Sequence, residues 1–377
     1  MKGPIPFAVA LWLVLQAAAF AAELKLTAPL DYEVVQRINS TEGRFRIAGM
    51  VHRASLSATA GLEARILPGT NSSWKKLSWN FDGTNFISEM AAPAGGWYYL
   101  ELRVLAGDEL IAASSIAHVG IGEVFVVAGQ SNAANHGEEK QKTRTGRVAT
   151  FDGRRWQPAN DPQPGASGAG GSFLPPFGDA IAERFNVPVG LVACGIGATS
   201  VREWLPRGTS FPNPPTLEGR VMKMPNGKWQ STGEAFESFT DRMQQLGQHG
   251  FRAVLWHQGE SDANQQDPTR TLPGKLYQAC LEKLIRESRR TIGWDAPWFV
   301  AQVSYHVPGD EASTDIRDAQ ASLWRAGVAL AGPDTDALKG DFREAGGTGV
   351  HFSGPGLKEH GARWAEKVVP WLEQQLR

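Results

Sequence analysis

The sequence predicts an α/β domain built on a parallel sheet, with a smaller β-sandwich and a leader segment ahead of it. From residue 24 to about 118, apolar and polar residues alternate between clusters of turn residues, which is typical of half-buried antiparallel strands. After residue 121, strands that are apolar throughout alternate with helical patterns, which indicates a parallel sheet covered by helices on both faces. With 377 residues, 42% of them hydrophobic, the chain is long enough for two cores. The predicted divisions are 1–22, 23–118 and 119–377.

The leader, "MKGPIPFAVALWLVLQAAAFAA", has the composition of a secretory signal peptide. It carries Lys2, then an apolar segment, then small residues around Ala19 and Ala21, which is the order of regions in such peptides. The apolar run is shorter than the ~20 residues that a membrane-spanning helix needs. We therefore expect cleavage near Ala21 or Ala22, a secreted or periplasmic protein, and no membrane span in the mature chain.

The segment 23–118 has the size and pattern of an immunoglobulin-like β-sandwich. In "GRFRIAG", for example, Phe45 and Ile47 alternate with arginines. Its aromatic residues allow two interpretations, a sugar-binding face or ordinary core packing, and packing is the commoner role of a tryptophan. These residues are Trp74, Trp79 and Trp97.

In the segment 119–377, small or polar residues follow three of the apolar strands. Ser131 follows "VFVVAG", Gly197 follows "GLVAC", and Glu260 follows "AVLW". Ligands of parallel α/β sheets bind beyond the carboxyl ends of the strands, so we expect these residues to meet at one edge. Helices are expected in "PPFGDAIAERF", "FESFTDRMQQLGQHG", "LYQACLEKLIRESRR" and a last amphipathic stretch through Trp364 and Trp371.

Ser131 stands where a nucleophile would be well placed. A serine hydroxyl needs a base to take its proton, and the acyl transition state needs hydrogen-bond donors aimed at the developing oxyanion. At a helix start, the Ser131 backbone N–H is unpaired and can be one donor. Others could come from backbone N–H groups of "CGIGATS" and from the Gln258 side chain. The strongest candidate for the base is His351, in the loop "GTGVHFSGPG". A simple helix cap is the alternative role for Ser131.

Four blocks of the chain resemble the SGNH hydrolases, in particular the branch of sialate O-acetylesterases and acetylxylan esterases. The blocks are "AGQSN", "IGATSVREWLP", "LWHQGESDA" and "VHFSGPG", in the family's order. The resemblance implies a flavodoxin-like α/β fold and a secreted serine esterase that removes O-acetyl groups from sialic acid or from plant or algal polysaccharide through an acyl-enzyme. It implies Ser131 as nucleophile, His351 as base, and an oxyanion hole of the Ser131 amide, the Gly197 amide and Gln258.

The chain departs from the family's commonest pattern at two positions. Thr348 stands three residues before His351, where the family usually has an aspartate that orients the histidine, and Ala198 stands where a glycine is usual. The third member of the triad is therefore open. We favour Glu260, as in some acetylxylan esterase relatives, over Asp262, Asp341 or a backbone carbonyl.

Several polar residues are candidates for contact with substrate: Asn132, His257 and Arg202 first, with His136, His306 and Arg317 as further possibilities. Arg202 and Arg317 could recognise the carboxylate of a sialic acid, although salt bridges on helix surfaces are the commoner role of such residues.

The sequence also argues against several partners. No cluster has metal-ligand spacing and no glycine-rich loop has a dinucleotide or phosphate pattern, so we predict no metal and no cofactor. A formal net charge of −1 gives no reason to expect nucleic acid. Cys194 and Cys280 are too few for a disulfide framework and are expected to be buried. The expected partner is an O-acetylated carbohydrate, and the sequence predicts no oligomeric state.

Two other functions compete with the carbohydrate esterase. A general short-chain esterase, of the SGNH or the α/β-hydrolase kind, is close in chemistry, because "GQSNA" approaches the Gly-x-Ser-x-Gly elbow; in α/β-hydrolases, however, several strands precede the serine. A non-catalytic carbohydrate-binding protein on the same fold is the second alternative, which Thr348 suggests because it cannot supply the orienting charge.

Overall fold

The computed structural model describes residues 23–52, 60–68 and 73–377, so the predicted signal peptide, 1–22, lies outside the described residues. The first strands are β1 (Glu23–Ala28), β2 (Glu33–Gln36), β3 (Glu42–His52), β4 (Ala60–Leu67), β5 (Lys75–Leu77), β6 (Trp79–Phe81), β7 (Asn85–Pro93), β8 (Gly95–Ala106) and β9 (Glu109–Gly129). The later strands are β10 (Val148–Phe151), β11 (Trp156–Pro158), β12 (Val189–Ala193), β13 (Ser210–Phe211), β14 (Val221–Lys223), β15 (Trp229–Ser231), β16 (Ala253–His257), β17 (Trp298–Gln302) and β18 (Leu330–Asp334).

The helical segments all follow β9. The α-helices are α1 (Leu174–Phe185), α2 (Glu234–Gln245), α3 (Gly274–Ile292), α4 (Thr314–Arg325), α5 (Glu344–Gly347) and α6 (Gly354–Gln375). The short 3-10 helices are η1 (Ser131–Ala133), η2 (Val201–Trp204), η3 (Pro268–Arg270) and η4 (Gly340–Phe342). The four helices that the sequence predicts correspond to α1, α2, α3 and α6, whereas α4 was not predicted.

The N-terminal region consists mainly of antiparallel strands around one apolar core, and only β2 among its described strands pairs in parallel, with β9. A four-stranded sheet has the order β1-β3-β7-β6, and a second layer is formed by β5, β4, β8 and the first half of β9. The predicted alternation is confirmed in β3, where Phe45 and Ile47 are buried and the adjacent Arg44 and Arg46 are exposed. Both layers contribute to the same buried cluster. The immunoglobulin-like topology stays a prediction.

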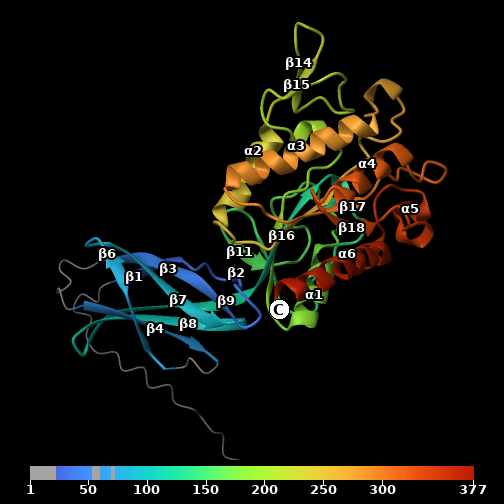
Figure 1. Cartoon of the computed structure of the whole chain (residues 1–377). Helices are drawn as coiled ribbons and strands as arrows, with labels where there is room; N and C mark the ends of the chain where they lie inside the picture. The colour runs from blue at the N-terminus through green and yellow to red at the C-terminus, as the bar shows by residue number, and fades with distance from the viewer. Residues whose placement is uncertain (1–22, 53–59, 69–72) are drawn as a thin grey trace, which may run out of the picture.

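One long strand joins this region to the rest of the molecule (Figure 1). β9 pairs antiparallel with β8 along its first half and parallel with β12 and β16 along its second half, Glu123–Gly129. The predicted division at 118/119 falls inside this strand. At the junction the buried Glu123 carboxylate accepts hydrogen bonds from Arg37 Nε at 2.6 Å and Arg252 Nε at 2.7 Å, so two guanidinium groups compensate its charge.

The central sheet of the second region has the order β11-β10-β12-β9-β16-β17-β18, and all neighbours are parallel except β10 and β11. Without the edge strands β10 and β11, the order numbered along the chain is 2-1-3-4-5, as in flavodoxin-like folds. The connections therefore diverge between β9 and β16. A crevice at the carboxyl ends of these two strands is where such sheets bind ligands.

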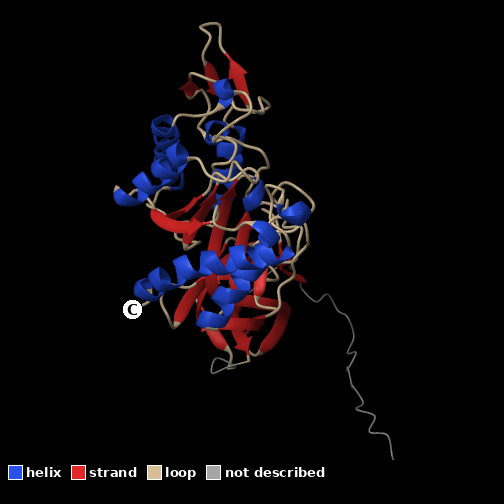
Figure 2. Ribbon diagram, turned by 90° about the vertical axis from the view of Figure 1, so that its right-hand side faces the viewer, coloured by secondary structure: helices blue, strands red, loops and turns tan. Residues whose placement is uncertain are grey.

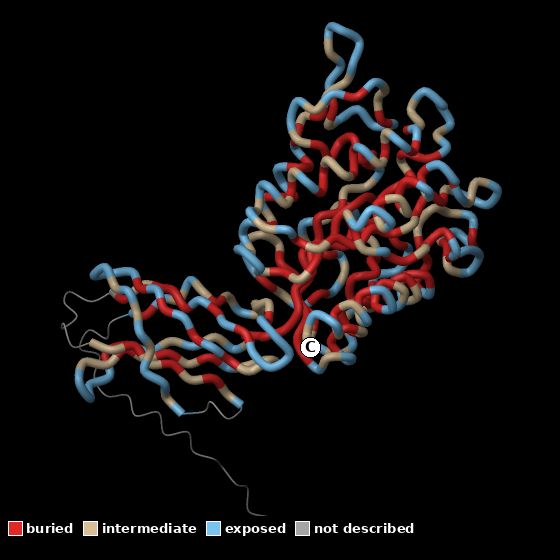
Figure 3. Tube along the Cα trace, in the orientation of Figure 1, coloured by how far each residue is buried: buried red, intermediate tan, exposed pale blue. Residues whose placement is uncertain are grey.

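Helices cover both faces of this sheet, as the continuous apolar strands predict. α1 and α6 lie on one face, and α2, α3 and α4 lie on the other (Figure 1). Along β9, Phe125 and Val127 pack with α1 and α6, whereas Val124 and Val126 pack with the opposite helices. Figure 3 shows the resulting band of buried chain through the centre of this region. The small sheet β13-β15-β14 stands at the end far from the N-terminal region (Figure 2).

Candidate active site

Ser131 begins the turn that follows β9. Gly129 has φ +133°, and a Cβ there would lie 2.0 Å from the His257 carbonyl oxygen, so only glycine lets the chain turn this close to β16. Ser131 is 5% exposed and lines a pocket of about 1020 Å³. Within the described part of the chain its backbone N–H donates to no carbonyl, because it is the first residue of η1.

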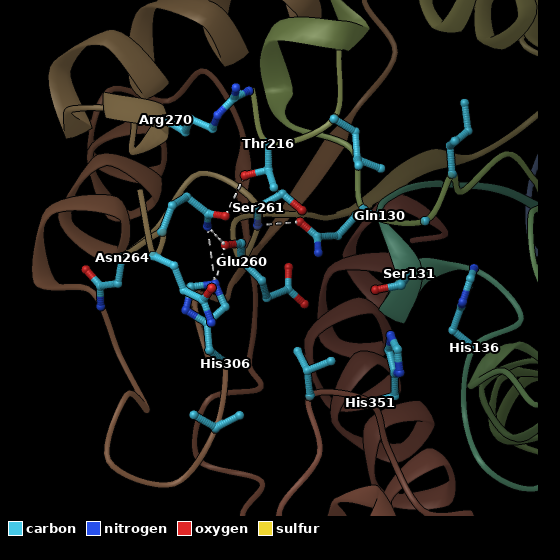
Figure 4. Close-up of a pocket in the computed structure, with 18 of the residues that line it drawn as sticks. Gln130, Ser131, His136, Thr216, Glu260, Ser261, Asn264, Arg270, His306 and His351 are labelled. Carbon is cyan, nitrogen blue, oxygen red and sulfur yellow. Dashed lines mark hydrogen bonds between the residues drawn. The ribbon is translucent and has the colours of Figure 1, made fainter. Parts of the chain in front are cut away.

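His351 lines the same pocket and is held by a carboxylate that the sequence did not suggest. Its Nδ1 lies 2.8 Å from Glu344 Oε1, and its backbone N–H donates to the same oxygen at 3.0 Å. The Glu344 backbone N–H donates to the His351 carbonyl oxygen at 3.0 Å, so the two residues face each other across a tight loop. Figure 4 shows His351 next to Ser131 on the pocket wall. This pairing leaves Nε2 as the nitrogen available to a serine proton.

The backbone between these two residues makes the pairing possible. Ala345 and Gly346 both have left-handed conformations, with φ of 52° and 65°, which turn the chain back on itself. Gly349 completes the contact, because a Cβ there would lie 2.1 Å from Glu344 Cγ. Directly after His351, Ser353 caps α6 by accepting a hydrogen bond from the Gly356 N–H at 3.2 Å.

The favoured third member, Glu260, does not contact the His351 ring, which corrects the prediction. Its Oε1 accepts a hydrogen bond from Asn132 Nδ2 at 2.9 Å, and the same amide donates to the Val350 carbonyl at 3.2 Å. Glu260 is only 2% exposed, and its Oε2 has no partner in the described structure. Burial raises the pKa of Glu260 to about 7. Glu260 therefore supports the His351 loop through Asn132.

The other carboxylates considered for this role also lie elsewhere. Asp262 is fully buried and accepts hydrogen bonds from Ser200 Oγ at 2.6 Å and the Val201 N–H at 2.8 Å, so it ties the loop after β16 to the start of η2. Asp341 is exposed. Thr348, at the family's aspartate position, donates from its hydroxyl to the Ala345 carbonyl oxygen at 2.9 Å.

Two predicted oxyanion donors are already engaged. The Gly197 N–H donates to Ser167 Oγ at 2.6 Å. Gln258 is fully buried, and its side-chain amide donates to Asp262 Oδ2 at 2.7 Å and to the Thr199 carbonyl at 3.2 Å. The structure therefore assigns Gln258 to the buried loop and not to the pocket. Ala198, the second departure from the family, has φ +58°, the conformation that favours the usual glycine.

The residues expected to touch substrate are mostly buried, which corrects that set. Arg202 is fully buried and donates to three carbonyl oxygens and to Asp262. His257 is fully buried beside Thr335, and burial lowers its pKa to about 3. Both donor hydrogens of the Asn132 amide are used within the protein. Arg317 is paired with two aspartates and does not line the pocket.

Other residues, some of them not singled out from the sequence, form the pocket walls. His136 and His306 do line it, as suggested. His306 Nε2 lies 2.6 Å from the Glu260 carbonyl oxygen. Further from Ser131 the lining residues include Thr216, Leu217, Arg220, Asn264, Gln265 and Arg270, several of which are labelled in Figure 4. The pocket thus combines the Ser131 and His351 pair with a mostly apolar wall that carries several polar side chains and two arginines.

Comparison with known proteins shows the family to which the chain belongs. The family described as carbohydrate esterase, sialic acid-specific acetylesterase, matches residues 121–370. The chain belongs to this family. The match confirms the resemblance to the sialate O-acetylesterase branch of the SGNH hydrolases and identifies the protein as a carbohydrate esterase. The comparison with curated proteins gave no match.

One solved structure supports the fold of this carbohydrate esterase, and a second is reported with it. A carbohydrate acetylesterase from Xanthomonas citri is similar over 90% of this chain and 74% of its own, with 17% identity and a TM-score of 0.51. A protein from Arabidopsis thaliana is similar over 66% of this chain and 98% of its own, with 17% identity and a TM-score of 0.46. At 17% identity the first likeness concerns the mixed α/β fold and not the substrate.

Residues 23–52, 60–68 and 73–377 contain no helix that is long and apolar enough to cross a membrane. No three histidine, cysteine, aspartate or glutamate side chains in those ranges gather as metal ligands. Both cysteines lie buried as free thiols.

Proposed function

We propose that this carbohydrate esterase removes O-acetyl groups from sugars with Ser131 as nucleophile, His351 as general base and Glu344 as the carboxylate that orients His351. The observation that carries the proposal is the Nδ1 contact of His351 with Glu344 at 2.8 Å in the pocket that Ser131 lines. A carboxylate on Nδ1 fixes the tautomer and stabilises the imidazolium formed when Nε2 takes a proton.

The reaction proceeds through an acetyl-enzyme. Ser131 Oγ attacks the acetyl carbonyl carbon while its proton moves to His351 Nε2, and the Ser131 N–H donates to the resulting oxyanion. The intermediate collapses, the bond to the sugar oxygen breaks, and that oxygen takes the proton from His351. Water then attacks the acetyl-enzyme by the same route in reverse, which releases acetate and restores Ser131.

An O-acetylated sugar fits this pocket in size and in the hydrogen-bonding groups that line it. Its volume of about 1020 Å³ exceeds what an acetyl group alone requires, and polar side chains set in a mostly apolar wall can form hydrogen bonds with sugar hydroxyls. Sialic acids and plant or algal polysaccharides are the substrate classes to test.

The segment 1–22 supports export to the periplasm or the medium. The mass of the exported protein tests whether this segment is cleaved: a mass that still includes residues 1–22 would contradict cleavage.

The experiment measures acetate release from three kinds of ester: O-acetyl sialic acids, acetylated xylan and p-nitrophenyl acetate. We expect Ser131→Ala to lose activity on all of them by several orders of magnitude, while its far-UV circular dichroism and Tm stay those of the wild type. Ser322→Ala, which removes a serine hydroxyl on α4 outside the pocket, should retain activity.

Three outcomes would contradict parts of the proposal. Near-wild-type hydrolysis by folded Ser131→Ala would exclude Ser131 as nucleophile. Activity on p-nitrophenyl acetate with none on any acetylated sugar would favour a general short-chain esterase. Sugar binding without turnover would favour a carbohydrate-binding protein. That alternative was suggested by Thr348, which cannot supply a charge to orient His351; Glu344 contacts the His351 ring instead.

A further inference from the structure

The hydroxyl oxygen of Ser167 accepts a hydrogen bond from a backbone N–H, that of Gly197, which the family resemblance assigns to the oxyanion hole. Gly197 N–H donates to Ser167 Oγ at 2.6 Å, and Ser167, Gly197 and Ser131 all line the same pocket. The chain around Gly197 runs beside the end of β9, where the Ile196 N–H donates to the Gly129 carbonyl at 2.9 Å. This bond holds the chain just before Gly197 against Gly129, which precedes Ser131 by two residues. The Gly197 N–H itself points at the Ser167 hydroxyl oxygen.

The loop that carries Ser167 is fixed from several sides. Asn135, which is 1% exposed, accepts a hydrogen bond from the Gln163 N–H at 2.6 Å and donates to the Gln163 and Ala166 carbonyls. The Ser167 N–H donates to the Gly195 carbonyl, and its own carbonyl accepts from the Asn135 N–H, both at 2.9 Å. These bonds hold Ser167 at a set position, as a preorganised donor requires.

A histidine makes the second contact with this hydroxyl. His136 Nε2 lies 3.0 Å from Ser167 Oγ, and a Cβ on Gly197 would lie 2.6 Å from the same nitrogen. Burial, and then the nearby His351, lower the pKa of His136, so the ring is neutral at pH 7 and carries one N–H. Its centroid lies 5.5 Å from that of His351.

We propose that Ser167 is a catalytic residue whose hydroxyl donates its hydrogen to the oxyanion of the tetrahedral intermediate. Its oxygen accepts from the Gly197 N–H and from His136 Nε2–H, which uses both lone pairs and leaves the hydroxyl hydrogen for the pocket. Donors on a hydroxyl oxygen polarise its O–H bond and strengthen the bond it donates. Ser167 then supplies the side-chain donor that Gln258 cannot supply. This inference rests on the proposed function.

Ser167→Ala provides the first test, on p-nitrophenyl acetate and on the best acetylated sugar. Loss of one oxyanion donor should lower kcat by about 10²–10³-fold with little change in KM. The affinity for a methylboronic acid, which forms a tetrahedral adduct on Ser131, should fall in parallel, while the affinity for the deacetylated sugar should not change. Ser167→Cys, a substitution of similar size with a weak donor, is the second variant should the alanine variant fail to fold, and the same loss is expected.

His136→Phe tests the direction of the second bond. Because the Ser167 hydroxyl remains, we expect a smaller loss of kcat than in Ser167→Ala. A rise in activity would instead mean that His136 takes the hydroxyl hydrogen, and would overturn the proposal.

If the wild type is active and a correctly folded Ser167→Ala enzyme has the same or a higher kcat, this inference alone is overturned. Ser167 would then only accept the hydrogen bond of the Gly197 N–H. Wild-type protein that releases no acetate from any ester would instead refute the proposed function. Ser322→Ala, which removes a serine hydroxyl on α4 outside the pocket, is the matched control in every assay.

Discussion

Two loops at the same pocket hold their carboxylates in opposite ways. In the loop after β16, Glu260 and Asp262 are 2% and 0% exposed, and their oxygens accept hydrogen bonds from neighbouring loops. In the loop before α6, the Glu344 side chain is 25% exposed and faces the ring of His351. The first loop uses its acids to hold the protein together, and the second presents its acid to the reacting histidine.

The difference follows from solvation. A carboxylate removed from water without a paired cation favours its neutral form, and burial accordingly raises the pKa of Glu260 to about 7. Such a group carries only part of a negative charge at neutral pH and can do little to stabilise an imidazolium. A carboxylate that stays partly in water, as Glu344 does, avoids most of that desolvation cost.

The largest effect expected from this comparison is in Glu344→Gln. The variant keeps the shape of the side chain and removes the charge beside His351 Nδ1, so we expect kcat to fall by about 10²-fold, and by up to ~10⁴ if the ring also loses its tautomer. Steady-state kinetics on acetylated substrates measure it. Asp341→Asn is the matched control, because Asp341 is an exposed acid nearby and its neutralisation should have no effect.

A reversed result, with active Glu344→Gln and inactive Asp341→Asn, would mean that the loop rearranges when substrate binds. Full activity in both variants would leave His351 held by backbone alone and remove the distinction between the two loops.

Gly349→Ala sharpens the comparison without touching either titratable group. A methyl group there would lie 2.1 Å from Glu344 Cγ and 2.8 Å from its Oε1, so the glutamate must move away from the ring. We expect kcat to fall by about tenfold or more, since an orienting carboxylate acts through its position. In a Glu344→Ala background the same change should add little, because its target is gone.

Gly346→Ala is the control for this prediction. Gly346 has φ +65° and no atom near a Cβ, so the substitution should cost about 1 kcal/mol of stability and leave kcat unchanged. Equal loss of activity in the two glycine variants would show that loop strain, and not the position of Glu344, is responsible.

The site can be located from the sequence because strand ends are visible in the chain. Ser131 and Gly197 follow continuous apolar runs, and both line the pocket. The sequence does not show which side of a loop faces inward, so it places Arg202 and Gln258 in the pocket although tertiary contacts bury them.

The position of Glu344 depends on a left-handed turn at Ala345, which alanine rarely adopts, and Ser167 lies on a loop with no strand or helix pattern. An acid seven residues before His351, with glycines between, was the available signal for Glu344. The strands β10 and β18 were missed because neither is a continuous apolar run: β10 contains Thr150, and β18 ends in Gly332, Pro333 and Asp334.

The smallest effect on catalysis, and the clearest effect on stability, is expected in Glu260→Gln. Glutamine keeps an oxygen for the Asn132 amide, so kcat should change by less than about tenfold, well short of Glu344→Gln. Stability should depend on pH. Unfolded Glu260 ionises near its ordinary 4.5, whereas the folded group keeps its proton up to about 7, so between these values the folded state binds more protons and the wild type loses stability as pH rises.

The glutamine variant lacks this contribution. Its Tm should match that of the wild type near pH 4.5 and exceed it near pH 8. The free energy of unfolding of the variant at pH 8 should be higher than that of the wild type by an amount on the order of 1–3 kcal/mol. The difference between the two proteins is the measurement to use, because burial also raises the pKa of Glu203 to about 7, and that contribution is common to both. A Tm difference that is the same at every pH would mean that Glu260 stays ionised in its buried position. The two loops would then hold equally charged acids, and position alone, not solvation, would separate the supporting carboxylate from the catalytic one.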